Sequence, residues 1–284
     1  MGKHSQSKFR LGISAIFFLV EGVRPEALKR LAGSAFDCVE VIWHPKFCDF
    51  DIEIANRTAQ NLRDIDVTCY SLHAPTGEMF DPSSEDASIR NHLLEVTKLL
   101  IEGAQILETD IIVMHASNRG VSESDRGPSL RRAADTLHEV ACMAHEARLQ
   151  LAIENLHHDM LGRDAEELDT LIDLIDMPNV GICFDTAHAY CDCGVRNFLK
   201  AVRSPIKSLH LVDNRLPDEE KTCWPFAPDG LIDWEEIVPL LREKTQSDVL
   251  MYEVYQNGCP DPTQDDIAQL CANAERMKTL WDSL

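Results

Sequence analysis

The sequence lacks three features that direct proteins to membranes or out of the cell. Its first residues, 1–8, are polar and have no apolar core of the kind found in secretory signals. The longest apolar run, residues 11–20, is too short to cross a bilayer, and Gln6 stands where a myristoylation pattern has Ser or Thr. We therefore expect a cytoplasmic protein without a membrane partner.

Basic residues are scarce in this chain. It has 27 Lys and Arg against 48 Asp and Glu, so its formal net charge is −21. A surface of this sign repels polyanions over a Debye length, and a nucleic-acid partner would need a local basic face. The sequence contains no cluster of Lys and Arg that would make such a face. We expect no nucleic-acid partner and assign the excess acid to solubility.

Signals for disulfides, domain linkers and nucleotide binding are also missing. The 10 cysteines of a long chain without a secretory signal are expected to be reduced thiols. Cys191 and Cys193 form a C-x-C pair, for which a metal or redox role stays open. No Pro-, Gly- and Ser-rich linker divides residues 1–284, and no G-x-G-x-x-G motif follows the first apolar run. These absences favour a single domain and disfavour an open dinucleotide-binding sheet.

Apolar runs of strand length alternate with helical patterns along the chain. Strands are predicted at residues 9–14, 36–43, 67–73, 111–115, 149–155, 180–185, 206–212 and 248–254. Helices are predicted from about Pro25 and over residues 51–64, 84–107, 130–147, 164–175 and 264–281. Sequential strand–helix units favour parallel strands with right-handed crossovers. Eight units in 284 residues, where a barrel needs about 250, predict one (β/α)8 TIM barrel.

A histidine or an acidic residue stands at the end of each predicted strand from the third to the eighth. These residues are His73, His115, Glu154, Asp185, His210 and Glu253. The C-terminal ends of barrel strands surround one mouth, so these side chains should converge. Three carboxylates packed together would raise at least one pKa, and a divalent cation removes that conflict. Mixed oxygen and nitrogen donors suit Mn²⁺, Mg²⁺ or Zn²⁺, and we expect one ion with room for two.

Six short motifs at these strand ends resemble one known superfamily. They are Ser71-Leu-His-Ala-Pro75, Val113-Met-His115, Ile153-Glu-Asn155, Phe184-Asp-Thr-Ala-His-Ala189, Leu209-His-Leu-Val-Asp-Asn214 and Tyr252-Glu-Val254. Together they resemble the xylose-isomerase-like TIM barrels over nearly the whole chain. That superfamily includes sugar isomerases, sugar epimerases and the endonuclease IV type of apurinic endonuclease.

The resemblance implies roles for individual residues. It implies a metal-binding quartet made of Glu154, Asp185, His210 and Glu253. His73 and His115 correspond to ligands that build a second metal site with Glu154 in the endonuclease branch. His188 matches a histidine that binds a third zinc in the endonucleases and contacts substrate in the epimerases.

The function that we expect is that of a metal-dependent sugar or sugar-phosphate isomerase or epimerase. The cation would polarise a carbonyl, Glu154 or Glu253 would remove the neighbouring proton, and the other carboxylate would return it through an enediolate held by the metal. His188 and Arg215 would hydrogen-bond the sugar. Trp43, His44, Trp224 and Phe226 lie on predicted loops at the barrel mouth, where they either form an apolar wall against the sugar ring or pack the loops themselves. Asp213 is read as structural or as a residue that supports the metal ligands, and His157 and His158 as pocket-lining or solvated.

Two other functions stay open. The first is a zinc-dependent, endonuclease IV-like apurinic/apyrimidinic endonuclease, but its third metal site needs an Asp-x-His pair, and Thr222 and Trp224 occupy those positions. The second is a sugar-binding barrel without catalysis. The absence of a Gly-rich phosphate loop after the last two strands favours an unphosphorylated sugar as the small-molecule partner. The sequence leaves homo-oligomerisation open.

Overall fold

The predicted strands form one parallel sheet in the computed structural model, which describes residues 9–21, 25–43, 51–216, 223–254 and 262–284. The strands are β1 (Arg10–Ser14), β2 (Cys38–Ile42), β3 (Thr68–His73), β4 (Ile111–His115), β5 (Gln150–Glu154), β6 (Val180–Asp185), β7 (Ile206–His210) and β8 (Val249–Tyr252). The sheet order runs from β7 down to β1 and then to β8. The bounds predicted for β4 and β6 are confirmed residue by residue, and the other strands differ by one to two residues at either end.

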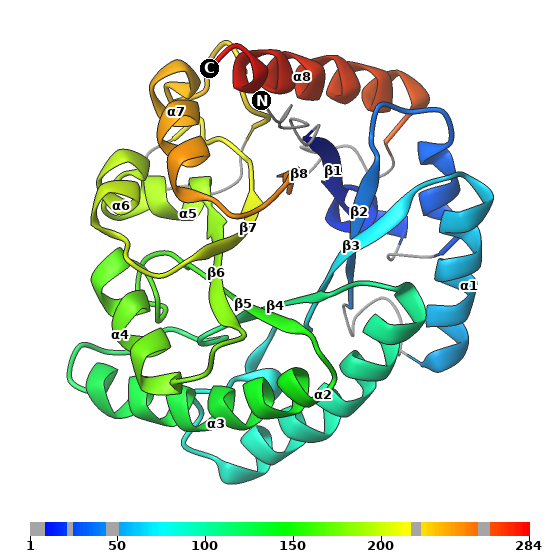
Figure 1. Cartoon of the computed structure of the whole chain (residues 1–284). Helices are drawn as coiled ribbons and strands as arrows, with labels where there is room; N and C mark the ends of the chain where they lie inside the picture. The colour runs from blue at the N-terminus through cyan, green and yellow to red at the C-terminus, as the bar shows by residue number, and fades with distance from the viewer. Residues whose placement is uncertain (1–8, 22–24, 44–50, 217–222, 255–261) are drawn as a thin grey trace, which may run out of the picture.

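The sheet closes into a barrel where β7 meets β8. The Leu211 N–H donates to the Met251 carbonyl at 2.8 Å, and Leu211 forms a parallel bridge with Tyr252. Figure 1 looks into this barrel, with the strands at the centre and the helices around them. The chain is therefore a (β/α)8 TIM barrel, as the alternating pattern predicted. Every strand end from β3 to β8 then opens on one mouth.

The helices make the outer ring of the barrel. They are α1 (Ile52–Asp64), α2 (Ala87–Leu107), α3 (Arg126–Glu146), α4 (Ala165–Ile175), α5 (Thr186–Cys191), α6 (Val195–Ala201), α7 (Trp234–Lys244) and α8 (Gln264–Asp282), with a single 3₁₀ turn, η3 (Glu78–Phe80), before α2. Several of them begin at a capping aspartate: the Asp51, Asp164 and Asp233 carboxylates accept N–H groups of the first turn. Part of the excess acid therefore has a structural use.

The connection between β1 and β2 differs from the expectation of a helix starting near Pro25. It contains two 3₁₀ segments, η1 (Ala15–Glu21) and η2 (Ala27–Leu31). Glu26, which precedes η2, makes no side-chain cap, and Gly33 soon follows with φ of 72°. Without a side-chain cap at its start, and with a left-handed glycine shortly after its end, this short segment forms 3₁₀ turns in place of an α-helix.

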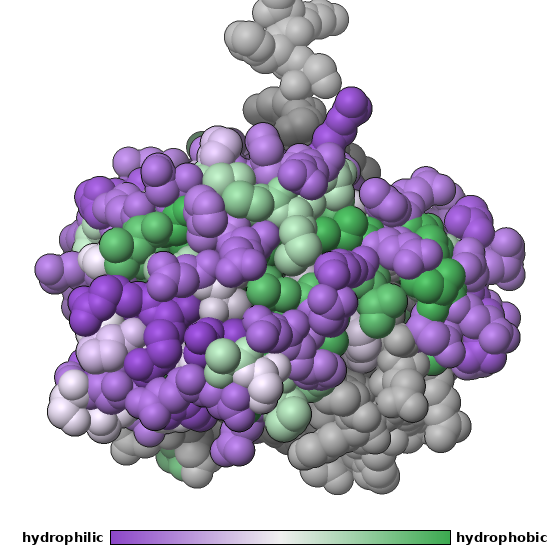
Figure 2. Space-filling model, turned by 90° about the horizontal axis from the view of Figure 1, so that it is seen from below, coloured by the Kyte–Doolittle hydropathy of each residue, from purple (hydrophilic) through white to green (hydrophobic). Residues whose placement is uncertain are grey.

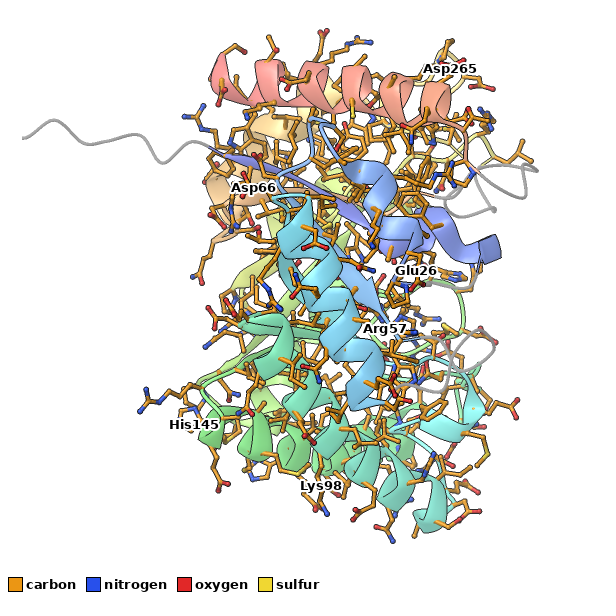
Figure 3. All side chains as sticks on the ribbon, turned by 90° about the vertical axis from the view of Figure 1, so that its right-hand side faces the viewer. Glu26, Arg57, Asp66, Lys98, His145 and Asp265 are labelled. Atoms are coloured by element: carbon orange, nitrogen blue, oxygen red, sulfur yellow. The ribbon has the colours of Figure 1, made fainter. Side chains whose placement is uncertain are left out.

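Polar side chains cover the outside of the helix ring. Figure 3 shows Lys98 of α2, His145 of α3 and Asp265 of α8 on the outer surface. The face seen in Figure 2 is mostly hydrophilic, with apolar residues between the charged ones. Among the described residues we find no helix with both the length and the apolar character needed to cross a bilayer.

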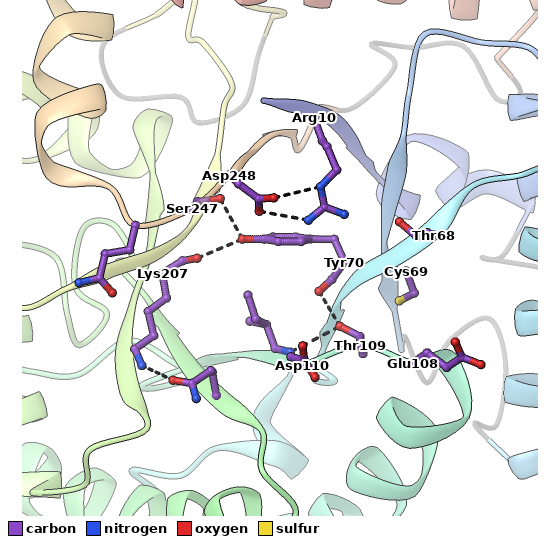
Figure 4. Close-up of a pocket in the computed structure, with 13 residues that line it drawn as sticks. Arg10, Thr68, Cys69, Tyr70, Glu108, Thr109, Asp110, Lys207, Ser247 and Asp248 are labelled. Carbon is purple, nitrogen blue, oxygen red and sulfur yellow. Dashed lines mark hydrogen bonds and ion pairs between the residues drawn. The ribbon is translucent and has the colours of Figure 1, made fainter. Parts of the chain in front are cut away.

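The opposite end of the barrel, at the start of the strands, holds a hollow of about 470 Å³ (Figure 4). Its lining is internally paired: Arg10 donates two hydrogen bonds to Asp248, the Tyr70 hydroxyl contacts the Ser247 hydroxyl, and Lys207 donates to Gln150. These residues lie at strand N-termini, whereas the predicted ligands lie at strand C-termini. The hollow is therefore separate from the candidate site.

Candidate metal centre

The predicted quartet comes together at the C-terminal mouth of the barrel. Glu154, Asp185 and His210 close β5, β6 and β7, and Glu253 directly follows β8. All four side chains are buried, and one ligand atom from each lies within 4.8 Å of the others. His210 Nδ1 is 3.1 Å from Glu253 Oε2, 3.3 Å from Glu154 Oε1 and 4.0 Å from Asp185 Oδ2.

A second group shares Glu154 with the quartet. Nε2 of His73 and Nε2 of His115 lie 3.1 and 3.3 Å from Glu154 Oε2. The two oxygens of Glu154 thus face different ways, Oε1 toward His210 and Oε2 toward the two other histidines. The structure brings all six predicted strand-end residues into one connected cluster, as expected for a barrel mouth.

Asn155 fixes the carboxylates and the next histidine in place, a role that sequence analysis did not assign to it. Its side-chain oxygen accepts the Asp185 N–H at 2.7 Å, and its amide donates to the Asp185 carbonyl at 3.0 Å. The Asn155 carbonyl accepts His188 Nδ1–H at 2.8 Å. One residue therefore ties the end of β5 to the end of β6, which keeps Glu154 and Asp185 at a constant separation.

The segment after β7 is held by two polar side chains. Thr186 Oγ1 donates to the Val212 carbonyl at 2.7 Å and accepts the Val212 N–H at 3.0 Å. Asp213 accepts the N–H groups of Asn214, Leu231 and Ile232 and the indole N–H of Trp234. Asp213 is structural, as predicted, because it organises the loop that leads into α7.

The histidine contacts fit a cation. His73 Nδ1 lies 2.8 Å from the Ala74 carbonyl, which can only accept, so this nitrogen carries the hydrogen. The other nitrogen of a neutral ring is then an acceptor, yet it faces Glu154 Oε2. His210 has carboxylates at both nitrogens, Glu40 at Nε2 and Glu253 at Nδ1. Each of these contacts requires a proton or a cation between nitrogen and oxygen, and the mixed donor set suits Mn²⁺, Zn²⁺ or Mg²⁺.

The pKa values follow this crowding. Burial lowers the pKa of His73, but the hydrogen bond to Glu154 and the nearby carboxylates raise it by more, so the net pKa is raised. Burial also lowers the pKa of His210, and Cys183 together with the carboxylates around the ring raises it well above its ordinary value. Burial dominates at His115, whose pKa is lowered. The raised pKa values thus belong to His73 and His210, the two rings whose nitrogens face these carboxylates most closely.

The residues predicted to contact substrate lie in different surroundings. His188 lies in the cluster, with Nδ1 3.3 Å from Glu154 Oε1. Arg215, by contrast, forms an ion pair with Asp229 at 2.8 Å and is half-exposed. His157 packs beside His188 with the two rings tilted and their centroids 5.0 Å apart, so His157 lines the cluster. The backbone N–H of its neighbour His158 donates to the Asp192 carboxylate.

The loop aromatics near the barrel mouth have different surroundings. Trp43 is buried directly after β2. The ring centroids of Trp224 and Phe17 are 6.5 Å apart, and Phe17 was not among the aromatics named from the sequence. The Arg276 guanidinium of α8 lies over the Phe226 ring, with its central carbon 4.1 Å from the ring centroid. Phe226 therefore packs against α8, which is the second of the two roles expected for these aromatics. His44 and Thr222 lie outside the described residues.

The C-x-C pair shows no metal cluster within the part of the chain that the structure describes. The Cys191 sulfur lies 3.4 Å from the Asn214 amide, which donates to it, and Cys193 contacts the Gly194 carbonyl. Burial raises the pKa of Cys193 to about 11. A thiol with such a pKa is protonated near neutral pH and is a weak ligand and nucleophile.

A comparison with protein families decides the assignment. The family described as xylose isomerase-like TIM barrel matches residues 28–276. The chain belongs to this family. All six strand-end residues of the cluster lie inside the matched region. A curated relative, named as the uncharacterized protein MJ1311 of Methanocaldococcus jannaschii, is 24% identical over 261 residues, 86% of this chain and 83% of the relative.

Solved structures of the same fold include sugar epimerases. A D-tagatose 3-epimerase-like protein aligns with a TM-score of 0.75 at 20% identity over 96% of this chain and 98% of that one. A D-psicose 3-epimerase solved in the presence of D-fructose aligns with a TM-score of 0.74 at 15% identity, over 96% of this chain and 97% of that one. An IOLI protein with a bound zinc atom aligns with a TM-score of 0.72 at 14% identity, over 96% of this chain and 98% of that one. At these identities the likeness establishes the fold.

Proposed function

We propose that this xylose isomerase-like barrel is a metal-dependent isomerase or epimerase acting on a small sugar. The observation that carries the proposal is the convergence of Glu154, Asp185, His210 and Glu253 at the barrel mouth, with ligand atoms within 4.8 Å of one another. The sugar epimerases among the structures of the same fold support the same reaction class.

The quartet would hold one divalent cation. A bound cation of this kind supplies Lewis-acid polarisation of a carbonyl oxygen. His210 would contribute Nδ1, since its Nε2 faces Glu40. The carboxylates of the quartet are buried, and a bound cation would favour their ionised form, in which they can act as bases.

Proton transfer falls to two residues of the chain. Glu253 or Glu154 removes the proton next to the substrate carbonyl, and the other carboxylate returns it. Return to the neighbouring carbon gives an isomer, and return to the opposite face of the same carbon gives an epimer. His188 donates Nδ1–H to the Asn155 carbonyl, so its Nε2 is the nitrogen that would accept a substrate hydroxyl. Arg215 would have to leave Asp229 to reach the sugar.

The charge of the site favours a second cation. Four carboxylates, those of Glu40, Glu154, Asp185 and Glu253, are buried together. One divalent cation balances two of them, and two cations balance all four. His73 and His115, with Glu154 Oε2 between them, supply the donor atoms for the second ion.

This second group is also what favours the alternative, a zinc-dependent endonuclease acting at abasic DNA sites. Against it, the position of Trp224 carries an indole, which is not a zinc ligand. The net charge of −21 also opposes binding of a polyanion. We therefore rank proton transfer on a sugar first.

Metal analysis and deuterium exchange test the proposal together. The protein as purified is assayed for bound metal, loaded with Mn²⁺ or Zn²⁺, and incubated in D₂O with a panel of ketoses and aldoses. We expect deuterium at a carbon next to the carbonyl. An abasic duplex serves as the parallel substrate, and its cleavage without any sugar exchange would replace this proposal by the endonuclease.

A further inference from the structure

A fourth buried acidic residue, Glu40, lies in contact with the quartet, whose own acidic members are Glu154, Asp185 and Glu253. It occupies the middle of β2 and is fully buried. Ser71 Oγ of the neighbouring strand donates to Glu40 Oε2 at 2.8 Å. His210 Nε2, which comes from β7 and is distant in sequence, lies 3.2 Å from the same oxygen. Within the described part of the chain, His210 is the residue that forms an ion pair with Glu40.

We propose that Glu40 is a positioning residue that selects the metal-binding tautomer of His210. This inference rests on the proposed function, because it concerns the same metal site. The Glu40 carboxylate can only accept, so it holds the hydrogen of the ring on Nε2. The lone pair of a neutral ring is then on Nδ1, the atom that lies 3.1 Å from Glu253 Oε2 and 3.3 Å from Glu154 Oε1. The ring is thereby fixed both in its tautomer and in its direction.

A carboxylate at this position also does more than a neutral acceptor would. Hydrogen bonding of a ligating imidazole to a carboxylate raises the basicity of the ring and so strengthens its bond to a metal. Burial of a carboxylate is costly unless a positive group compensates it, so filling space alone does not explain Glu40. The other inward-facing neighbour on β2, Cys38, is uncharged and packs with Tyr70, Val249 and Met251.

Glu40→Gln separates positioning from packing, since glutamine has nearly the same size and keeps an oxygen acceptor. We expect the affinity for Zn²⁺, measured by competition with a chromophoric chelator, to fall about 10–100-fold. The metal-free variant should unfold at a lower temperature than the wild type, because His210 loses the charged partner of a buried ion pair, so the Zn²⁺ affinities are compared at a temperature where both proteins are folded. Ser208→Ala is the matched control: Ser208 is equally buried, lies on the same strand as His210, and its hydroxyl makes no hydrogen bond with the described residues. Its Zn²⁺ affinity should match that of the wild type.

The tautomer itself is measured on the wild-type protein, so this measurement does not depend on the folding of Glu40→Gln. Long-range ¹H–¹⁵N spectra of the Zn²⁺-loaded protein, with the His210 signals assigned by their loss in His210→Asn, should show the hydrogen on Nε2 and the metal-shifted nitrogen as Nδ1. The opposite pattern, or Zn²⁺ affinity of Glu40→Gln within twofold of the wild type, contradicts the positioning role. A wild-type protein that binds no Zn²⁺ contradicts the proposed function itself.

Discussion

Removing divalent cations should destabilise this barrel more at high pH than at low pH. In the metal-free protein the pKa values of His73 and His210 are raised above the ordinary value of about 6.5. A raised pKa in the folded state means that protonation stabilises the fold fully below about pH 6.5, and that this stability is lost as the pH rises through the folded-state pKa. The cluster is then left with unprotonated rings facing buried carboxylates.

A bound cation reverses this trend. It takes the place of the protons and binds the unprotonated rings, so its affinity increases with pH. At a free metal concentration 100 times the Kd, binding to the folded state contributes about 2.7 kcal/mol. With an unfolding entropy of about 2.1 cal/mol/K per residue, or about 0.6 kcal/mol/K for 284 residues, that stabilisation raises Tm by about 4–5 °C.

Thermal unfolding with and without a chelator measures the difference in Tm at several pH values. The difference in Tm between metal-loaded and chelator-treated protein should increase from about pH 6 to pH 8. Burial lowers the pKa of His115, so this ring does not share the trend expected from the raised pKa values of His73 and His210. A gap that stays constant or narrows with increasing pH would refute the idea that protons and cations share these positions.

Other substitutions test individual contacts in the cluster. Glu253→Gln should still bind the ion of the quartet, but more weakly, and should lower both turnover and solvent deuterium exchange about 10²–10⁴-fold. Glu154→Gln should have the same effects and should also release the second ion, which elemental analysis would count. His115→Ala should reduce two bound ions to one without unfolding the protein, since this ring contacts Glu154 Oε2 alone among the cluster carboxylates described. Asp213→Ala leaves three buried N–H donors, those of Asn214, Ile232 and the Trp234 indole, without this acceptor and should cost about 3–5 kcal/mol in chemical denaturation. Trp234→Phe removes one of these donors and should cost about 1 kcal/mol from that hydrogen bond.

The positions of the candidate ligands could be predicted from the sequence because a closed barrel brings the C-terminal ends of all its strands to one mouth. A residue at the end of an apolar run must lie at the mouth, whichever strand carries it. For this reason His73, His115, Glu154, Asp185, His210 and Glu253 were found without any knowledge of distances. The ends of β4 and β6 were predicted to the residue, since a histidine or an aspartate interrupts each apolar run there.

Residues that act through long-range contacts could not be predicted in this way. Glu40 stands in mid-strand, and its partner His210 is 170 residues away along the chain. Asn155 was visible as part of a motif, but only the fold shows that it bridges two strand ends. The helix α7 was not predicted, because Pro239 interrupts its pattern, and η1 and η2 replace an α-helix for lack of a cap. Loop aromatics such as Phe226 carry no periodicity that would tell an inward from an outward orientation.

The central claim is that this barrel moves a proton on a metal-polarised sugar, and solvent exchange tests it most directly. The wild-type protein, loaded with Mn²⁺ or Zn²⁺ and freed of excess metal, is incubated in D₂O with a panel of unphosphorylated and phosphorylated ketoses and aldoses, and the sugars are read by NMR. We expect deuterium at the carbon next to the carbonyl of at least one sugar, and its loss when a chelator removes the ion. Full metal loading with no exchange in any sugar would rule out proton transfer on these sugars.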